Sequence, residues 1–233
     1  MKHSQTSDNR SAARTAVYRL IVAVALLVAA AIILSIPVYY ETMTLWYKTG
    51  IDKTMLKAGQ YLGLVALLLI HLQVAISARG SILSSLFGPA LLVRLHRLNG
   101  LFIAASACIH VLLVLVPEGM SNLPIGWKFW PEAVGAVLLL IIAATTLTSY
   151  FRNSIRLSYG LWQAVHKPAG YLVLALVTVH ALFVSESFEH MVPRLLLAAL
   201  FLLTVGTVLA AKFKGRRSLT GSSTHQQGGI DEH

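Results

Sequence analysis

Charged residues are scarce in this sequence of 233 residues. Asp, Glu, Lys and Arg make up only 12% of the chain, about half of the ~25% typical of a soluble domain, whereas hydrophobic residues make up 56%. The apolar residues come in blocks, each long enough to cross a bilayer core of about 30 Å. These features exclude a soluble chain and predict an all-α, polytopic membrane protein.

Cysteine and the acidic residues are also rare. Cys108 is the single cysteine, which excludes an internal disulfide and any cluster held by several cysteines. Nine Asp and Glu residues stand against 19 Lys and Arg residues, which gives a net charge of +10. The basic residues lie between the apolar blocks and not in one tract. This distribution is typical of charge that sets membrane orientation, and it argues against nucleic acid as a partner.

Six apolar segments predict a bundle of six transmembrane helices embedded in the lipid bilayer. Their expected ranges are 17–39, 58–78, 91–116, 131–150, 161–184 and 192–213. The segment 80–89 is predicted to be a turn-rich connection. We expect residues 1–16 to form a flexible cytoplasmic arm, residues 17–213 to form one transmembrane domain, and residues 214–233 to form a disordered cytoplasmic tail.

The basic residues also predict the orientation of the bundle. Fourteen of the 19 Lys and Arg residues fall in the segments that face the cytoplasm if the N-terminus lies inside. The positive-inside rule therefore predicts a multi-pass integral protein with both termini in the cytoplasm, and we expect the membrane to be a bacterial inner membrane. The third and fifth helices then both run outward.

Histidines recur at one spacing on the third and fifth predicted helices. His96 and His110 are fourteen residues apart, as are His166 and His180. Fourteen helical residues make almost four full turns, so the two histidines of each helix share one face, about 21 Å apart along the axis. Because both helices run outward, His96 is predicted to pair with His166 near the inner side, and His110 with His180 near the outer side.

This constellation suggests iron chemistry inside the membrane. Ionisable groups there are costly and are candidates for a functional site. Neutral imidazole is a good iron ligand, and haem is commonly held by axial histidines. Two imidazoles on one iron leave no axial position open, which favours electron transfer over oxygen binding. The alternative, that each histidine only bonds to a neighbouring helix, explains the repeated spacing of four histidines less well.

Three cations lie next to the inner histidines. Arg94, Arg97 and Lys167 are candidates for binding the propionates of a haem, and the alternative is that they only enforce orientation. The fifth helix can begin near residue 161 or only at Pro168, because proline disfavours helical geometry in the residue before it. If the helix begins at Pro168, His166 lies in the preceding turn.

A fifth intramembrane histidine, His71, is predicted on the second helix together with Gln73. Three roles are open for it: a substitute inner ligand, a contact for a proton or a quinone, or a packed polar residue. The last of these is the simplest role for a lone polar side chain in an apolar helix.

The chain resembles the ferric reductase-like transmembrane domain superfamily, which includes ferric reductases, NADPH oxidases and the haem-binding membrane subunit of the bacterial methionine sulfoxide reductase system. The resemblance covers roughly residues 60–212 and is most specific at the Leu-His-Arg motif of 95–97 and the Trp-x-x-x-His-Lys motif of 162–167. It implies two b-type haems between the third and fifth helices, with electrons carried outward. By this resemblance, His96 and His166 would bind one haem, and His110 and His180 would bind the other.

The family also implies partners. Ferric reductases and NADPH oxidases carry a flavin and nicotinamide module after the sixth helix, whereas only about twenty residues follow it here, without a Gly-rich dinucleotide fingerprint. We therefore expect a membrane subunit of an oxidoreductase, with no catalytic residues of its own. Its expected donor is a cytoplasmic flavin reductase or a quinol. Its expected acceptor is ferric iron, oxygen or a periplasmic oxidoreductase on the outer side.

Two other function classes remain open. Histidine pairs of the same spacing also occur in the cytochrome b of quinol-oxidising complexes. A non-redox transporter or assembly subunit would instead use the histidines for protons or a metal ion. Proton relays usually include a carboxylate, and we expect no Asp or Glu within the six spans, which counts against this last class.

Overall fold

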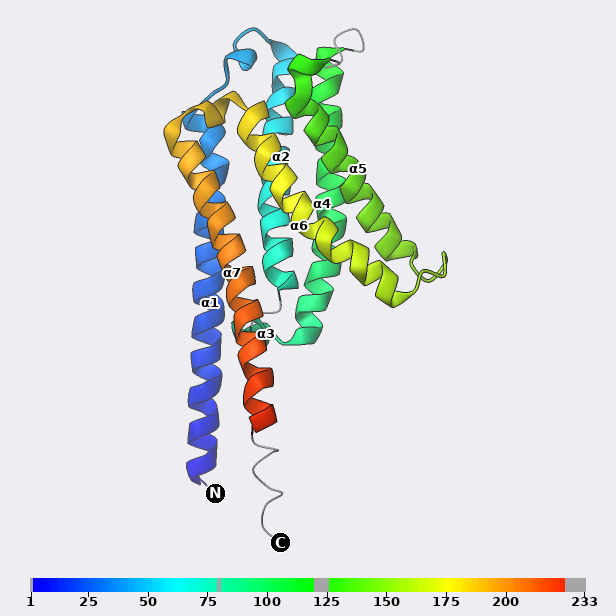
Figure 1. The fold of residues 1–233 in the computed structure, drawn as a ribbon. Coiled ribbons are helices and arrows are strands. Elements are labelled where there is room, and N and C mark those ends of the chain that lie inside the picture. The colour runs from blue at the N-terminus through cyan, green and yellow to red at the C-terminus, as the bar shows by residue number, and fades with distance from the viewer. Residues whose placement is uncertain (1, 79–80, 120–125, 225–233) are drawn as a thin grey trace.

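The computed structural model describes residues 2–78, 81–119 and 126–224, and within these ranges it is built from helices without any strand. Six of the described helices are long and apolar enough to cross a membrane. They are α1 (Lys2–Tyr39), α2 (Gly50–Ser77), α4 (Pro89–Glu118), α5 (Trp130–Phe151), α6 (Tyr159–Val184) and α7 (Met191–Thr224) (Figure 1). The prediction of an all-α membrane protein with six spanning helices is confirmed.

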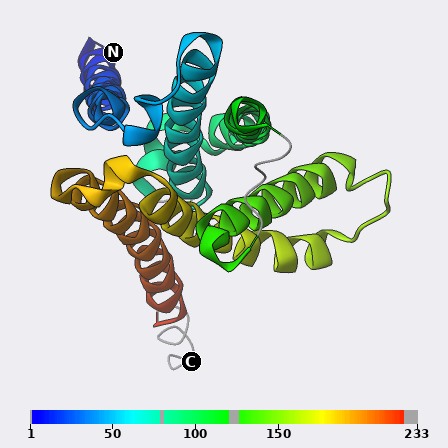
Figure 2. The same cartoon turned by 90° about the horizontal axis from the view of Figure 1, so that it is seen from above.

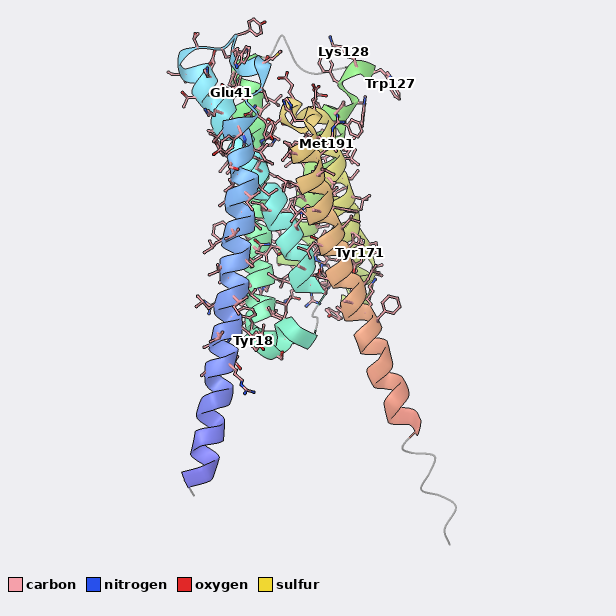
Figure 3. All side chains as sticks on the ribbon, turned by 90° about the vertical axis from the view of Figure 1, so that its left-hand side faces the viewer. Tyr18, Glu41, Trp127, Lys128, Tyr171 and Met191 are labelled. Carbon is pink, nitrogen blue, oxygen red and sulfur yellow. The ribbon has the colours of Figure 1, made fainter. Side chains whose placement is uncertain are left out.

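The shorter helices lie at the two ends of the bundle. They are η1 (Met43–Leu45), α3 (Ser81–Phe87), η3 (Trp127–Phe129) and η4 (Glu186–Glu189). The three η helices lie at one end, and α3 lies towards the other, from which α1 and α7 project (Figure 1). Glu41, Lys128 and Met191 mark the first of these ends in Figure 3, where α1 and α7 diverge towards the chain termini. The first residues of α1 and the last residues of α7 therefore lie at the same end of the bundle.

Local sequence signals explain where several helices begin and end. Gly88 adopts a φ of 74°, and Pro89 then opens α4, a position that suits proline because its fixed φ is already helical. Gly119, with a φ of 76°, ends the same helix. Ser158 caps α6, because its hydroxyl oxygen accepts a hydrogen bond from the backbone N–H of Leu161 at 3.4 Å.

Helix α2 is the central helix of the bundle. Inside its most apolar window 44% of the residues are buried, against 6% to 17% in the other five spans. It contacts α1, α4, α6 and α7 (Figure 2). Leu67 and Ile70 of α2 belong to one apolar core with Ile103 of α4, Val173 of α6 and Leu197 of α7.

Polar side chains join α2 to α4 inside this apolar setting. Asn99 donates one hydrogen bond to the backbone oxygen of Leu69 at 2.9 Å and another to Oε1 of Gln73 at 2.8 Å. The amide of Gln73 in turn donates to the backbone oxygen of His96 at 2.9 Å. Since helix association in a membrane depends on close packing and on such hydrogen bonds, this network fixes how α4 lies along α2.

The remaining helices form a second packed pair. α5 packs mainly on α6, and the pair extends away from α1 and α2 (Figure 2). α4 packs mainly on α2, whereas α4 and α6 do not pack closely on each other in the described part of the chain. Besides α1 and α7, the fold therefore contains two helical hairpins, α2–α4 and α5–α6, and the two helices that carry the paired histidines belong to different hairpins.

Three boundaries differ from the sequence predictions. Residues 2–16 were expected to be a flexible arm, but α1 already begins at Lys2, because no proline or glycine interrupts this stretch. α7 continues to Thr224, so helix replaces the expected disorder at 214–224, while residues 225–233 lie outside the described residues. The connection 80–89 contains a short helix of seven residues, α3, whose side chains from 83 to 87 include two leucines and a phenylalanine.

The network around Asn99 gives a first test. In an Asn99→Leu variant α2 and α4 lose two hydrogen bonds and Oε1 of Gln73 loses its donor, so we expect the free energy of unfolding to fall by about 1–2 kcal/mol. Thermal unfolding of the purified protein in detergent measures this change. Asn153→Leu, at an exposed position after α5, is the matched control. Equal unfolding temperatures for both variants would contradict a role of the network in joining the helices.

Candidate functional site

The structure brings the four predicted histidines together in two pairs, called here the inner pair (His96 and His166) and the outer pair (His110 and His180). The ring centroids of the inner pair lie 6.2 Å apart, with the ring planes at 74° to each other. His110 and His180 lie close enough to interact electrostatically. Each pair has one ring from α4 and one from α6, as the equal spacing predicts.

His166 lies inside a helix and not in a preceding turn. α6 begins at Tyr159, seven residues before His166, and runs through Pro168 without ending. The cap at Ser158 explains this start, and proline is accommodated in the second helical turn and beyond only by giving up one backbone hydrogen bond. His166 and His180 therefore lie on one continuous helix, so the prediction that they share a face of it applies to the whole segment.

Two side chains fix the ring of His166. Trp162 stacks on it, with ring centroids 4.6 Å apart and planes at 23°. The hydroxyl of Ser149 donates to the backbone oxygen of Thr145 at 2.6 Å and accepts from Nε1 of Trp162 at 3.2 Å. Nδ1 of His166 lies 3.3 Å from the same oxygen. Because the hydroxyl proton is already used, Nδ1 of His166 acts as the donor in this contact.

Backbone oxygens hold the two rings of the outer pair. Nδ1 of His110 lies 2.7 Å from the carbonyl oxygen of Gly59 on α2, and Nδ1 of His180 lies 2.9 Å from that of Pro131 on α5. A carbonyl oxygen only accepts, so each Nδ1 carries the proton. In a neutral ring Nε2 is then an unprotonated nitrogen with a lone pair.

Three of the four imidazoles thus share one arrangement, with Nδ1–H bound to oxygen and Nε2 unprotonated. This is the arrangement in which a histidine binds a metal through Nε2 while its other nitrogen fixes the orientation of the ring. His96 differs, because the amide nitrogen of Gln73 lies 3.4 Å from its Nε2. No group of three or more His, Cys, Asp or Glu side chains in the described residues is placed to hold a metal ion.

The three predicted propionate partners lie at the end of the bundle that holds the termini. Arg94, Arg97 and Lys167 are exposed, and none forms an ion pair or a side-chain hydrogen bond within the part of the chain that the structure describes. A fourth cation, Arg152, places its guanidinium carbon 5.9 Å from the ring of Trp162. The inner pair therefore lies at a basic end of the bundle.

His71 and Glu132 also lie inside the spans, and each has a buried side-chain atom. His71 is only 3% exposed, its Nδ1 donates to the backbone oxygen of Leu67 at 2.9 Å, and its Nε2 has no hydrogen-bond partner among the described residues. Glu132, in the first turn of α5, interacts electrostatically with His180, and its Oε2 is buried without a partner in the described part. The prediction that the spans hold no Asp or Glu is therefore wrong: Glu132 lies within the predicted range 131–150, and the spans of the structure also include Asp52 and Glu118.

The sequence prediction missed the residues that hold the rings: Gly59, Gly63, Pro131, Gly135 and Ser149. Gly59 and Gly63 could have been found from the sequence, because their Gly-x-x-x-Gly spacing on α2 is typical of helices that pack closely. Ser149 carried no such signal, since a serine near the end of an apolar helix is common and its partner lies on another helix.

Fold and site together define a six-helix membrane protein with paired imidazoles between two helical hairpins. Residues 62–177 match the family model described as ferric reductase like transmembrane component. The chain therefore carries a ferric reductase-like transmembrane domain, and the predicted resemblance is confirmed. The match runs from α2 into α6, so it includes His96, His110 and His166 and ends just before His180. Searches of curated proteins and of solved structures gave no match.

The family assigns the chain a coarse function. A ferric reductase-like transmembrane domain indicates a role in electron transfer at the membrane, together with a redox partner. It also agrees with the six spans of the structure, which make the chain a multi-pass integral membrane protein.

The arrangement of the rings predicts their protonation. In protein labelled with ¹⁵N-histidine, at alkaline pH where free histidine is neutral, we expect His110, His166 and His180 to show a protonated Nδ1 and an unprotonated Nε2 in NMR spectra. Single His→Gln variants assign the signals. Unfolded chain is the control and should show the tautomer mixture of free histidine. A protonated Nε2 at His110 or His180 would contradict the hydrogen bonds described above.

Proposed function

We propose that the chain is a b-type di-haem protein that carries electrons across the membrane. The observation that carries this proposal is the inner pair, whose ring centroids lie 6.2 Å apart. Imidazole nitrogens bind metals at about 2 Å, so two rings on opposite sides of one iron have centroids roughly 6 Å apart. The spacing of His96 and His166 therefore fits one iron between them.

The donor chemistry of the site supports the same assignment. His96 and His166 would hold the inner haem, and His110 and His180 the outer haem. A haem held by two imidazoles would supply one-electron transfer. The residues of the chain orient the ligands: oxygen atoms on α2 and α5 bind the Nδ1–H of three rings and leave Nε2 as the metal-binding nitrogen.

The exposed cations at the inner pair would bind haem propionates. Arg94 and Arg97 lie within one helical turn of His96, and Lys167 directly follows His166. Hydrogen bonds between cations and carboxylates are about twice as strong as neutral ones, and arginine offers two parallel donors. These three side chains have no competing carboxylate within the described residues, which leaves them available for that contact.

The orientation of the bundle sets the direction of transfer. The start of α1, the end of α7, the inner pair and its cations lie at one end, and the excess of basic residues at that end favours the cytoplasmic side of a bacterial inner membrane. Electrons would enter there from a flavin reductase or a quinol. They would leave at the outer pair to ferric iron, oxygen or a periplasmic oxidoreductase.

Haem content tests the proposal directly. Purified protein, expressed with sufficient haem, should show the reduced-minus-oxidised bands of low-spin b-type haem and contain about two haems per chain. His110→Ala or His180→Ala should lower the content towards about one, because each variant removes an axial ligand from the outer site. His190→Ala, which changes a histidine outside the two pairs, is the control and should keep both haems. A colourless wild-type protein would contradict the proposal.

Labelling from one side of the membrane tests the orientation. In a Cys108→Ser background, Asp52→Cys and Asn153→Cys place single exposed thiols near opposite ends of the bundle. With intact spheroplasts, we expect a membrane-impermeant maleimide to label the thiol at 52 and not the thiol at 153. Permeabilised cells are the control, in which both should react. Labelling of 153 alone would reverse the proposed direction.

A further inference from the structure

The ring of His110 packs against the backbone of α2 at Gly59 and Gly63, and a site of this kind is called here a socket. Its Nδ1 donates to the carbonyl oxygen of Gly59, and its ring lies against Gly63, four residues further along the helix. A Cβ atom added at Gly63 would lie 2.9 Å from Cε1 and 3.0 Å from Nδ1 of His110. Real Cβ atoms essentially never show the shorter of these distances, so no other residue at 63 leaves the ring in place.

His180 occupies a socket of the same construction on α5. Its Nδ1 donates to the carbonyl oxygen of Pro131, and its ring lies against Gly135, again four residues further along. A Cβ atom added at Gly135 would lie 2.8 Å from Nδ1 and 3.1 Å from Nε2 of His180, and closer still to Cε1. The two outer histidines are therefore held in the same way by helices of different hairpins.

Helix geometry explains the glycine at the fourth position. Every Cα–Cβ bond of a helix tilts towards the N-terminus, so a side chain covers the helical turn before its own Cα. The side chain at position i+4 therefore covers the carbonyl of residue i. That carbonyl has two lone pairs, one for the N–H of residue i+4 and one for an outside donor. With glycine at i+4 this side chain is missing, and at Gly63 and Gly135 the ring of a histidine occupies its place.

The inner pair is held differently. Nδ1 of His166 contacts the hydroxyl of Ser149, and His96 contacts the side chain of Gln73. Glycines elsewhere on the spanning helices also lack this relation, since a Cβ atom added at Gly170 or Gly206 would meet no atom within 4 Å. The close contact between a glycine and a histidine ring thus singles out the outer pair.

We propose that Gly63 and Gly135 are positioning residues of the outer haem site. Each admits an imidazole to the carbonyl four residues earlier, which fixes the Nδ1–H tautomer and leaves Nε2 unprotonated. This inference rests on the proposed function, because it takes His110 and His180 as the axial ligands of one haem. The consequence is that two glycines that do not bind the iron determine whether the outer haem is retained and at what potential it is reduced.

Alanine variants test the sockets. Gly63→Ala and Gly135→Ala add the single atom that the rings exclude, and Gly170→Ala and Gly206→Ala make the same change where space is open. The effect of alanine on helix propensity is the same in all four. We expect the two socket variants to lose about one haem per chain, or to shift the potential and the low-spin EPR signal of one haem while the other stays unchanged. The two control variants should match the wild type.

The results separate this inference from the proposed function. Wild-type protein without haem would overturn the proposed function. Wild-type protein with two haems, accompanied by socket variants that keep both haems with unchanged potentials and EPR signals, would overturn the role of the glycines and leave the di-haem assignment standing. A loss in the control variants equal to that in the socket variants would also overturn it.

A second measurement covers socket variants that fold poorly, and it does not depend on haem. In the double variant Gly63→Ala with His110→Ala the ring that meets the new Cβ atom is gone, so we expect the same thermal unfolding temperature in detergent as for His110→Ala alone. Gly135→Ala with His180→Ala should match His180→Ala in the same way. If Gly63→Ala lowers the unfolding temperature equally with and without His110, the glycine serves general helix packing and the inference is wrong.

Discussion

The hydrogen bond from an imidazole Nδ1 to an oxygen of a neighbouring helix is the interaction on which the site depends. Water is absent from the bilayer core, so a polar ring there must find its partner within the protein. In His110, His166 and His180 that partner takes the proton-bearing nitrogen and leaves Nε2 as the reactive one. A single contact thus satisfies a polar group, chooses the tautomer and sets the direction in which the ring presents its lone pair.

Helix α2 combines two tasks that usually fall to different parts of a membrane protein. It is the most buried span and supplies much of the apolar core. On its side facing α4 it also supplies the oxygen that holds His110 and the amide that contacts His96. Gly59 supports both tasks, because a Cβ atom there would lie 3.0 Å from Cγ2 of Val114. The close approach of α2 and α4 is therefore a condition for the site as well as for the fold.

Much of the architecture could be predicted from the sequence, since span length, capping signals and the spacing of fourteen residues are properties of single helices. The outer rings show where such reasoning ends. Which carbonyl His110 or His180 reaches depends on how two helices are rotated and shifted against each other, and no pattern within one helix records this. Glu132 was missed for a different reason: it lies in the first turn of α5, within the predicted range 131–150, where a carboxylate is easily counted with the preceding loop. The helical continuation of α1 to Lys2 shows that polar composition alone does not end a helix.

The two hairpins have a consequence for how the protein is made. Each outer ligand is held by the spanning helix that precedes it in the chain: His110 on α4 by α2, and His180 on α6 by α5. A growing chain that enters the membrane therefore orients each imidazole as soon as its own hairpin closes, before the other half has been synthesised. In the proposed di-haem protein, the two hairpins would then need only to come together around the haem. The order of insertion and the order of site assembly are the same.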